Sequence, residues 1–195
     1  MQETIFRSAE EAVRAASMLK EPASLRFMEQ TAEALAQCFR EGHKVLIAGN
    51  GGSLCDAMHF AEEFTGQFRK PRPALAAIAL ADPGHMSCVG NDMGFEQIFA
   101  RSVEALGQAG DVLIVMTTSG NSVNLVRAVH MAKSKGLTTI AFLGKTGGQM
   151  KGLCDLEWIV SGFAYSDRIQ EAHMAAGHII IERVEQCVFC STANV

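Results

Sequence analysis

The sequence predicts a three-layer α/β domain whose centre is a parallel sheet of about five strands, preceded by an N-terminal helical hairpin. Continuous apolar runs, rather than alternating ones, are typical of strands that are buried on both faces, as in a parallel sheet. Five such runs occur, at 44–48, 74–80, 112–116, 138–143 and 156–160. Helical patterns separate most of them, as the crossover connections of parallel strands require, at 53–67, 94–107 and 122–135.

The remaining segments fit the same architecture. Residues 8–19 and 23–39 carry apolar side chains at helical spacing, and Pro22 marks the break between them. A long helix is expected over about 167–188. Because 195 residues suffice for one core and no linker or repeat is visible, we expect a single domain over 1–195. Its N-terminal helices cover 1–42, and its α/β core with the C-terminal helix covers 43–195.

Composition narrows the choice of partner and location. A net charge of −4 provides no basic footprint, so nucleic acid is not an expected partner. No apolar segment approaches the roughly 20 residues needed to span a bilayer, and no signal peptide is visible. We therefore expect a cytoplasmic protein without membrane contact. The hydrophobic content of 48% favours buried subunit interfaces.

A glycine-rich loop follows the first predicted strand. Gly49, Asn50, Gly51, Gly52 and Ser53 lead from the run 44–48 into a helix. Unpaired N–H groups and the helix dipole make such a place suitable for phosphate. The loop is not a dinucleotide fingerprint, because that pattern requires glycine where Leu54 stands, and no Gly-Lys-Ser/Thr follows as in a Walker A loop.

A second polar loop follows the strand at 112–116. It contains Thr117, Thr118, Ser119, Gly120, Asn121 and Ser122, directly before a helix. Capping that helix requires only one hydroxyl or amide group, and this is the alternative to a ligand site. Five hydrogen-bonding side chains without a Lys or Arg indicate a phosphate held by neutral donors and the dipole. The loops 49–53, 81–92 and 117–122 all follow strands, and ligands bind beyond the carboxyl ends of such strands.

Candidate acid/base groups lie on two helices. His59 and Glu63 are spaced i, i+4 and so share a face, while Leu54, Met58, Ala61 and Phe64 are expected to form the packing face. The alternative is that His59 and Glu63 are ordinary surface residues. In the last helix Gln170, His173 and His178 stand among apolar residues, where a histidine can also be a satisfied core residue.

Taken together, these motifs resemble one family. The chain is similar to the sedoheptulose 7-phosphate isomerases (phosphoheptose isomerases), which have the sugar isomerase (SIS) fold, along nearly its whole length. The segments that carry the resemblance are the glycine loop 49–53, Asp56 to Glu63, Gly90-Asn91-Asp92, Thr117 to Ser122 and Arg168 to Glu171.

The resemblance implies an aldose–ketose isomerisation of sedoheptulose 7-phosphate to D-glycero-D-manno-heptose 7-phosphate through an enediol, the first step towards the heptose of lipopolysaccharide or related glycans. It implies Glu63 and His178 as acid/base residues, and one zinc ion per subunit on His59, Glu63, Gln170 and His178. It also implies a homotetramer with sites at subunit interfaces. The implied substrate contacts are Asn50, Gly51, Gly52, Ser53, Glu63, Asn91, Asp92, Thr117, Thr118, Ser119, Ser122, Asp167 and Gln170.

Two points concern individual positions. Gln170 and His178 are eight residues apart, about 12 Å along a continuous helix. They reach one metal only by leaning inward, with Gly177 permitting a local distortion, or if a neighbouring chain supplies one of them. The family usually carries arginine after Thr65-Gly66, where this chain has Gln67; Arg69 is nearby and could substitute.

Two other functions remain open. One is a non-catalytic SIS-fold adaptor that binds the replication initiator, which could keep the phosphate loops without the acid/base residues. The other is an isomerase for a different phosphosugar. The presence of His59, Glu63 and His178 favours an enzyme over the adaptor.

Overall fold

A computed structural model of the chain describes residues 2–189, and its centre is one five-stranded sheet in which all neighbouring strands are parallel. The spatial order is β2-β1-β3-β4-β5. The chain therefore moves outward in opposite directions from β1 and β3, which makes the gap beyond their carboxyl ends the switch point of the sheet. The α/β class and the five parallel strands are confirmed. The strands are β1 (Val45–Gly49), β2 (Ala77–Ala79), β3 (Val112–Thr117), β4 (Thr138–Gly144) and β5 (Leu156–Val160).

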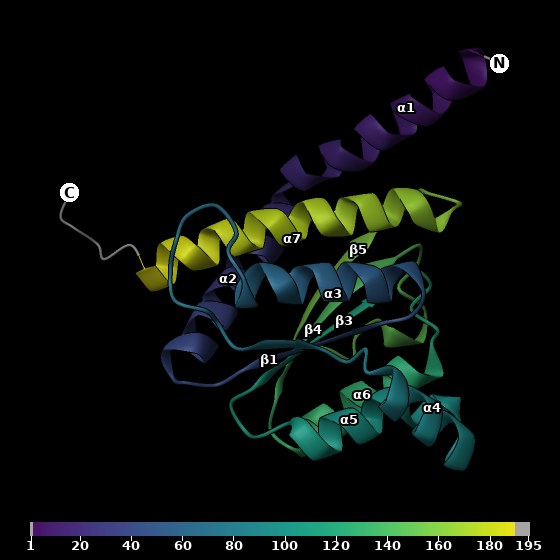
Figure 1. Cartoon of the computed structure of the whole chain (residues 1–195). Helices are drawn as coiled ribbons and strands as arrows, with labels where there is room; N and C mark the ends of the chain where they lie inside the picture. The colour runs from purple at the N-terminus through teal and green to yellow at the C-terminus, as the bar shows by residue number, and fades with distance from the viewer. Residues whose placement is uncertain (1, 190–195) are drawn as a thin grey trace.

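Helices cover both faces of the sheet, as continuous apolar strands require. On one face lie α2 (Pro22–Arg40), α3 (Gly52–Thr65) and α7 (Ser166–Phe189), and on the other lie α4 (Pro83–Asp92), α5 (Ile98–Leu106) and α6 (Val123–Ser134) (Figure 1). Successive strand residues alternate between the two layers. Ile47 packs in the core with α3 and α7, whereas Leu46 packs in the core with α5 and α6.

The N-terminal pair of helices is also present. α1 (Gln2–Ser17) leads through a short 3-10 turn, η1 (Met18–Lys20), into α2, whose first residue is Pro22. Proline suits this position because the first N–H groups of a helix have no partner within the helix. α1 packs on α7, and its N-terminal end projects away from the rest of the molecule (Figure 1). None of the helices within 2–189 is long and apolar enough to cross a membrane.

Three local predictions were wrong. The segment 81–92 is not a loop but contains α4, which Asp82 caps by accepting a hydrogen bond from the His85 N–H at 2.6 Å. β2 pairs over only three residues rather than across 74–80.

The predicted packing face of α3 was right at Ala61 and Phe64 and wrong at Met58, and Leu54 is only half-buried. Ala57, Phe60, Ala61 and Phe64 are the buried apolar side chains of this helix, whereas Met58 is 51% exposed.

Candidate active site

Two helices begin side by side at the switch point of the sheet. Gly51, at φ +57°, precedes α3, and Ser122 precedes α6. The Ser122 hydroxyl makes no capping hydrogen bond to its helix, so capping does not account for it. The site thus combines helix N-termini, which attract anions, with an uncommitted hydroxyl.

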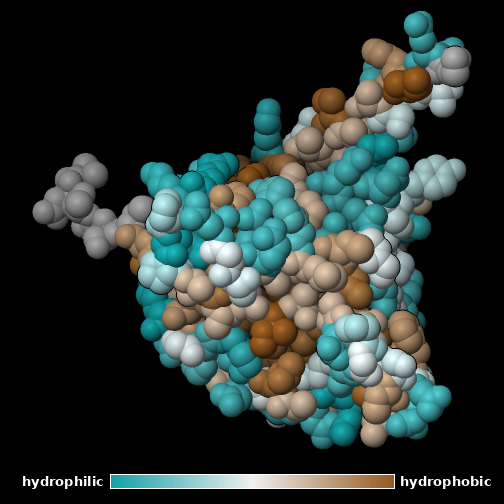
Figure 2. All heavy atoms as spheres, in the orientation of Figure 1, coloured by the Kyte–Doolittle hydropathy of each residue, from teal (hydrophilic) through white to brown (hydrophobic). Residues whose placement is uncertain are grey.

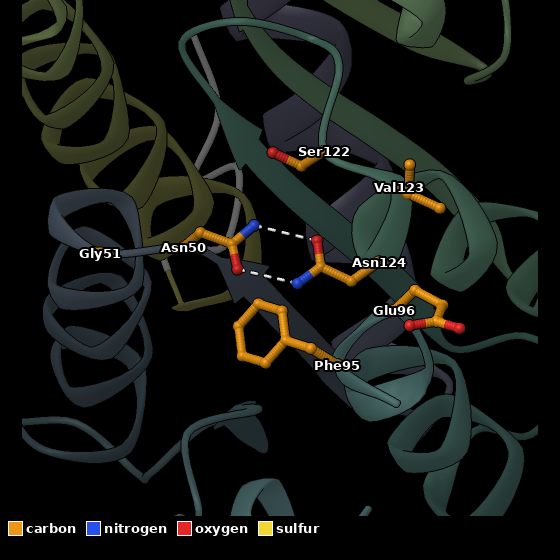
Figure 3. A pocket seen from close by; sticks show the side chains of 7 residues that line it. All are labelled: Asn50, Gly51, Phe95, Glu96, Ser122, Val123 and Asn124. Atoms are coloured by element: carbon orange, nitrogen blue, oxygen red, sulfur yellow. Dashed lines mark hydrogen bonds between the residues drawn. The ribbon is translucent and has the colours of Figure 1, made fainter. Parts of the chain in front are cut away.

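A reciprocal amide pair joins the two helix starts. The Asn50 side-chain amide donates to Asn124 Oδ1 at 3.0 Å, and the Asn124 amide donates back to Asn50 Oδ1 at 2.9 Å (Figure 3). Beside this pair is a cavity of about 490 Å³. Sequence reasoning missed Asn124 and three further lining residues (Phe95, Glu96 and Val123), although Val123 and Asn124 stand just after the predicted polar loop. The lining residues are Asn50, Gly51, Phe95, Glu96, Ser122, Val123 and Asn124.

The loop between β3 and α6 is held in shape by its own polar groups. The Gly120 N–H donates to Thr117 Oγ1 at 3.2 Å, and the Asn121 N–H donates to Ser119 Oγ at 3.2 Å. Gly120 adopts φ +67°, and a Cβ atom there would overlap the Gly147 carbonyl oxygen. Contacts within the chain therefore fix the conformation of this loop.

Three predicted ligating groups come together two to three turns along α3. His59 Nε2 lies 3.0 Å from His178 Nε2 and 3.6 Å from Glu63 Oε1. One ligand atom from each of the three residues lies within 4.8 Å of the others. The other ring nitrogen of His59, Nδ1, lies 3.1 Å from Glu62 Oε1, which orients the ring. This metal-ligating trio (His59, Glu63 and His178) is brought together across 119 residues of chain.

Gln170 lies elsewhere in the same subunit. Its Nε2 is 3.5 Å from Ser53 Oγ, and its amide leaves no room for a side chain at Gly52. α7 is continuous from Ser166 to Phe189, so Gln170 and His178 remain about 12 Å apart along the axis. Gln170 is thus placed with the glycine loop rather than with the trio of its own chain.

The other predicted substrate contacts are distributed around the site. Thr118 Oγ1 hydrogen bonds to Ser166 Oγ at 3.0 Å, which connects the polar loop to the start of α7. Asp167, in the first turn of α7, has a side chain that is 58% exposed. Asn91 and Asp92 end α4, are exposed, and hydrogen bond to each other at 2.7 Å. None of these residues lines the cavity beside Asn50.

Two titratable groups near the site have shifted pKa values. Burial raises the pKa of Asp56 to about 6, against the opposing effect of His59, and its Oδ2 has no hydrogen-bond partner among the described residues. Burial also lowers the pKa of His173 to about 4, although its Nε2 donates to the Leu143 carbonyl at 3.0 Å. His173 is therefore a neutral core histidine.

Comparison with known proteins agrees with this geometry. Residues 10–144 match the SIS domain family. The phosphoheptose isomerase of Fusobacterium nucleatum is 58% identical over 161 residues, which cover 83% of this chain and 82% of the relative. That of Escherichia fergusonii is 51% identical over 171 residues, 88% of this chain and 89% of the relative.

Solved structures give the same result. The phosphoheptose isomerase of Neisseria gonorrhoeae superposes with a TM-score of 0.88 at 36% identity, covering 95% of this chain and 98% of that one. That of Francisella tularensis has a TM-score of 0.88 at 35% identity, with the same coverage. A shared fold, high identity over most of the chain and the convergent trio place this chain in the SIS-domain family, as a member of the phosphoheptose isomerases.

Proposed function

We propose that this isomerase interconverts sedoheptulose 7-phosphate and D-glycero-D-manno-heptose 7-phosphate with Glu63 and His178 as its acid/base pair. The observation that carries the proposal is the convergence of His59, Glu63 and His178 on one point, two to three turns along the helix that starts at the proposed phosphate cradle. The phosphate cradle is the glycine loop 49–53 together with the polar loop 117–122. Both belong to the switch point of the sheet.

The reaction has two steps, each with a proton transfer at carbon and one at oxygen, and a carboxylate and an imidazole can divide these. One group removes a proton from C1 of the ketose while the C2 carbonyl oxygen gains a proton, which gives the enediol. The carbon proton then returns at C2 as the oxygen on C1 loses its own, which gives the aldose. The side chain of Glu63 is 15% exposed, so its carboxylate acts with limited access to water.

The trio also fits a zinc ion. Two imidazole nitrogens and a carboxylate form a common zinc ligand set, and two ligands of a tetrahedral zinc lie about 3.3 Å apart. His59 Nε2 lies 3.0 Å from His178 Nε2 and 3.6 Å from Glu63 Oε1, and these two distances bracket this value. A zinc ion held there would polarise the substrate carbonyl and stabilise negative charge on its oxygen. Glu63 would then act as a base only through its second oxygen or after leaving the metal.

Gln170 would complete this ligand set only from a neighbouring subunit. Within its own chain it lies beside Ser53, so we propose it as a substrate contact there. The exposed apolar residues of α1 support an assembly. Ile5, Phe6 and Val13 are 66%, 62% and 67% exposed, and Figure 2 shows apolar atoms on the projecting helix. We propose a homotetramer with sites at its interfaces, in the cytoplasm, that supplies heptose for lipopolysaccharide or related glycans.

The spacing of the two halves of the site matches the substrate. From Gly52 to His59 and Glu63 the rise along α3 is roughly 10 to 16 Å. The phosphate of the substrate is on C7, whereas the reacting carbons are C1 and C2, at the other end of the molecule. A cradle at the start of α3 and reactive groups farther along it therefore suit a long sugar phosphate.

Turnover measurements test the assignment. Purified protein is supplied with zinc and sedoheptulose 7-phosphate, and heptose phosphate is followed for the wild type, Glu63→Gln and His178→Gln. His130→Gln, which removes an exposed histidine on α6, is the matched control. We expect both site variants to lose at least a hundredfold in kcat while keeping the far-UV circular dichroism spectrum of the wild type. Full activity in both would exclude Glu63 and His178 as the acid/base pair.

The same assay separates the other candidates. A panel of shorter sugar phosphates identifies a different preferred phosphosugar as the substrate with the highest kcat/KM. Absence of turnover in the wild type with metal present favours a non-catalytic adaptor.

A further inference from the structure

The connection that leaves α3 carries two side chains that hold the acid/base residues from outside the site. It runs from Gly66 to Arg72 and loops beside the C-terminal half of α7 (Figure 1). We propose that Arg72 and Phe68 of this connection are positioning residues, which fix Glu63 and His178 relative to each other. The inference rests on the acid/base roles proposed above for Glu63 and His178.

Arg72 binds the end of α3 at the position of Glu63 itself. Its Nη2 donates to the Glu63 carbonyl at 2.5 Å, and its Nη1 donates to the Phe64 carbonyl at 2.7 Å. These carbonyls belong to the last turn of α3, where carbonyl groups lack partners within the helix and a cation is favourable. The guanidinium group therefore fixes the turn from which the Glu63 side chain extends.

The same guanidinium group is tied to α7. Arg72 Nε donates to Glu185 Oε1 at 2.6 Å, and the side chains of Arg72 and Glu185 are 4% and 14% exposed. Glu185 lies seven residues, two helical turns, beyond His178 and so on the same face of α7. One buried cation thus connects the helix of Glu63 with the helix of His178.

Phe68 acts directly on the second residue of the pair. Its ring stacks on the His178 imidazole, with centroids 5.8 Å apart and planes inclined by 21°. The imidazole is then held between Phe68 on one side and His59, whose ring meets it edge-on at 5.2 Å. A ring held in this way keeps its Nε2 directed at His59 and Glu63. Neither Arg72 nor Phe68 belongs to a motif for phosphate or metal, which is why sequence reasoning missed them.

The test uses conservative variants of the full chain. Phe68→Leu keeps an apolar side chain but removes the stacking surface, and Arg72→Lys keeps the charge but loses the fork that reaches two carbonyls and Glu185. Lys70→Gln is the matched control, because it removes a positive charge from an exposed position of the same connection. For each protein, kcat, KM and the affinity for Co²⁺ are measured, the last by the absorption of the bound ion.

We expect Phe68→Leu and Arg72→Lys to lower kcat and Co²⁺ affinity by about tenfold or more each, as losses of supporting residues around a metal do. KM should stay within about twofold, because the phosphate cradle is not touched. Lys70→Gln should match the wild type. Folded Phe68→Leu and Arg72→Lys proteins with wild-type kcat and Co²⁺ affinity would overturn the inference, as would a rise in KM at unchanged kcat.

Two controls keep the outcomes distinct. Thermal unfolding of each variant identifies any protein that has lost its fold, and the Phe68→Leu variant decides the question if Arg72→Lys does not fold. Glu63→Gln is measured beside them. If Glu63→Gln is fully active, the proposed acid/base pair fails; if Glu63→Gln is inactive while the positioning variants are unaffected, only the present inference fails.

Discussion

The buried His173 makes the stability of the fold depend on pH in a way that can be calculated. It is fully buried against Phe142 and Trp158, and burial lowers its pKa from 6.5 to about 4. Between these values the unfolded chain binds a proton that the folded chain does not, so the free energy of unfolding falls as the pH falls. From pH 7 to pH 5 this linkage amounts to about 2 kcal/mol.

Comparison of wild type with His173→Gln isolates this contribution. Glutamine keeps an N–H group that can donate to the Leu143 carbonyl but does not titrate. Urea unfolding at pH 7 and pH 5 should give a loss of stability that is about 2 kcal/mol smaller in the variant. His130→Gln, at an exposed position, serves as the control.

Other titrating groups do not obscure the comparison. Burial raises the pKa of Asp56 to about 6, which affects both proteins alike. Asp111 keeps a lowered pKa because hydrogen bonds from Lys44 and Gln108 outweigh its burial, so it stays ionised throughout this range. An equal pH dependence in wild type and His173→Gln would refute the reasoning.

Three further predictions concern the cradle and the sheet. Ser122→Ala should raise KM at least tenfold with little change in kcat, because a hydrogen bond to a charged group contributes about 1.5–3 kcal/mol. Steady-state kinetics measure both constants, and an unchanged KM would contradict a contact between Ser122 and the phosphate. Gly120→Ala should lower Tm more than Gly152→Ala, since both have left-handed backbones but only the first would overlap a neighbouring carbonyl; equal Tm values would contradict this. Asp111→Asn should lower the free energy of unfolding in urea by about 2 kcal/mol, because a hydrogen bond between charged groups, here from Lys44 Nζ at 2.6 Å, contributes about 1.5–3 kcal/mol; an unchanged midpoint would contradict this.

The strands could be predicted because their signal is local. Every residue of β1 and β3 is buried, so each appears as an uninterrupted apolar run. α4 lacked such a signal, since Val89 is its only buried residue. Its start could have been found, because Asp82 followed by Pro83 is a common way to begin a helix. β2 was overestimated because apolar residues at 74–76 continue beyond the paired segment.

The site was predictable only in part, for a physical reason. The phosphate loops are contiguous in sequence, so their chemistry is visible without the fold. The trio is not, because His178 meets His59 only after α7 packs beside α3, and the i, i+4 pair alone does not distinguish a site from a surface. The proposed roles of these residues, and the single-domain boundaries, stay predictions.

One helix, α3, contributes to both halves of the site, and this limits how the enzyme can change. Gly52 lies at the phosphate cradle, while His59 and Glu63 lie two and three turns farther along the same helix. One residue inserted between them would turn the reactive groups by about 100° around the axis and move them by about 1.5 Å. Single insertions or deletions in this part of α3 would therefore separate the two halves of the site. A new sugar preference in this fold has to come instead from substitutions of cavity side chains such as Phe95 and Glu96.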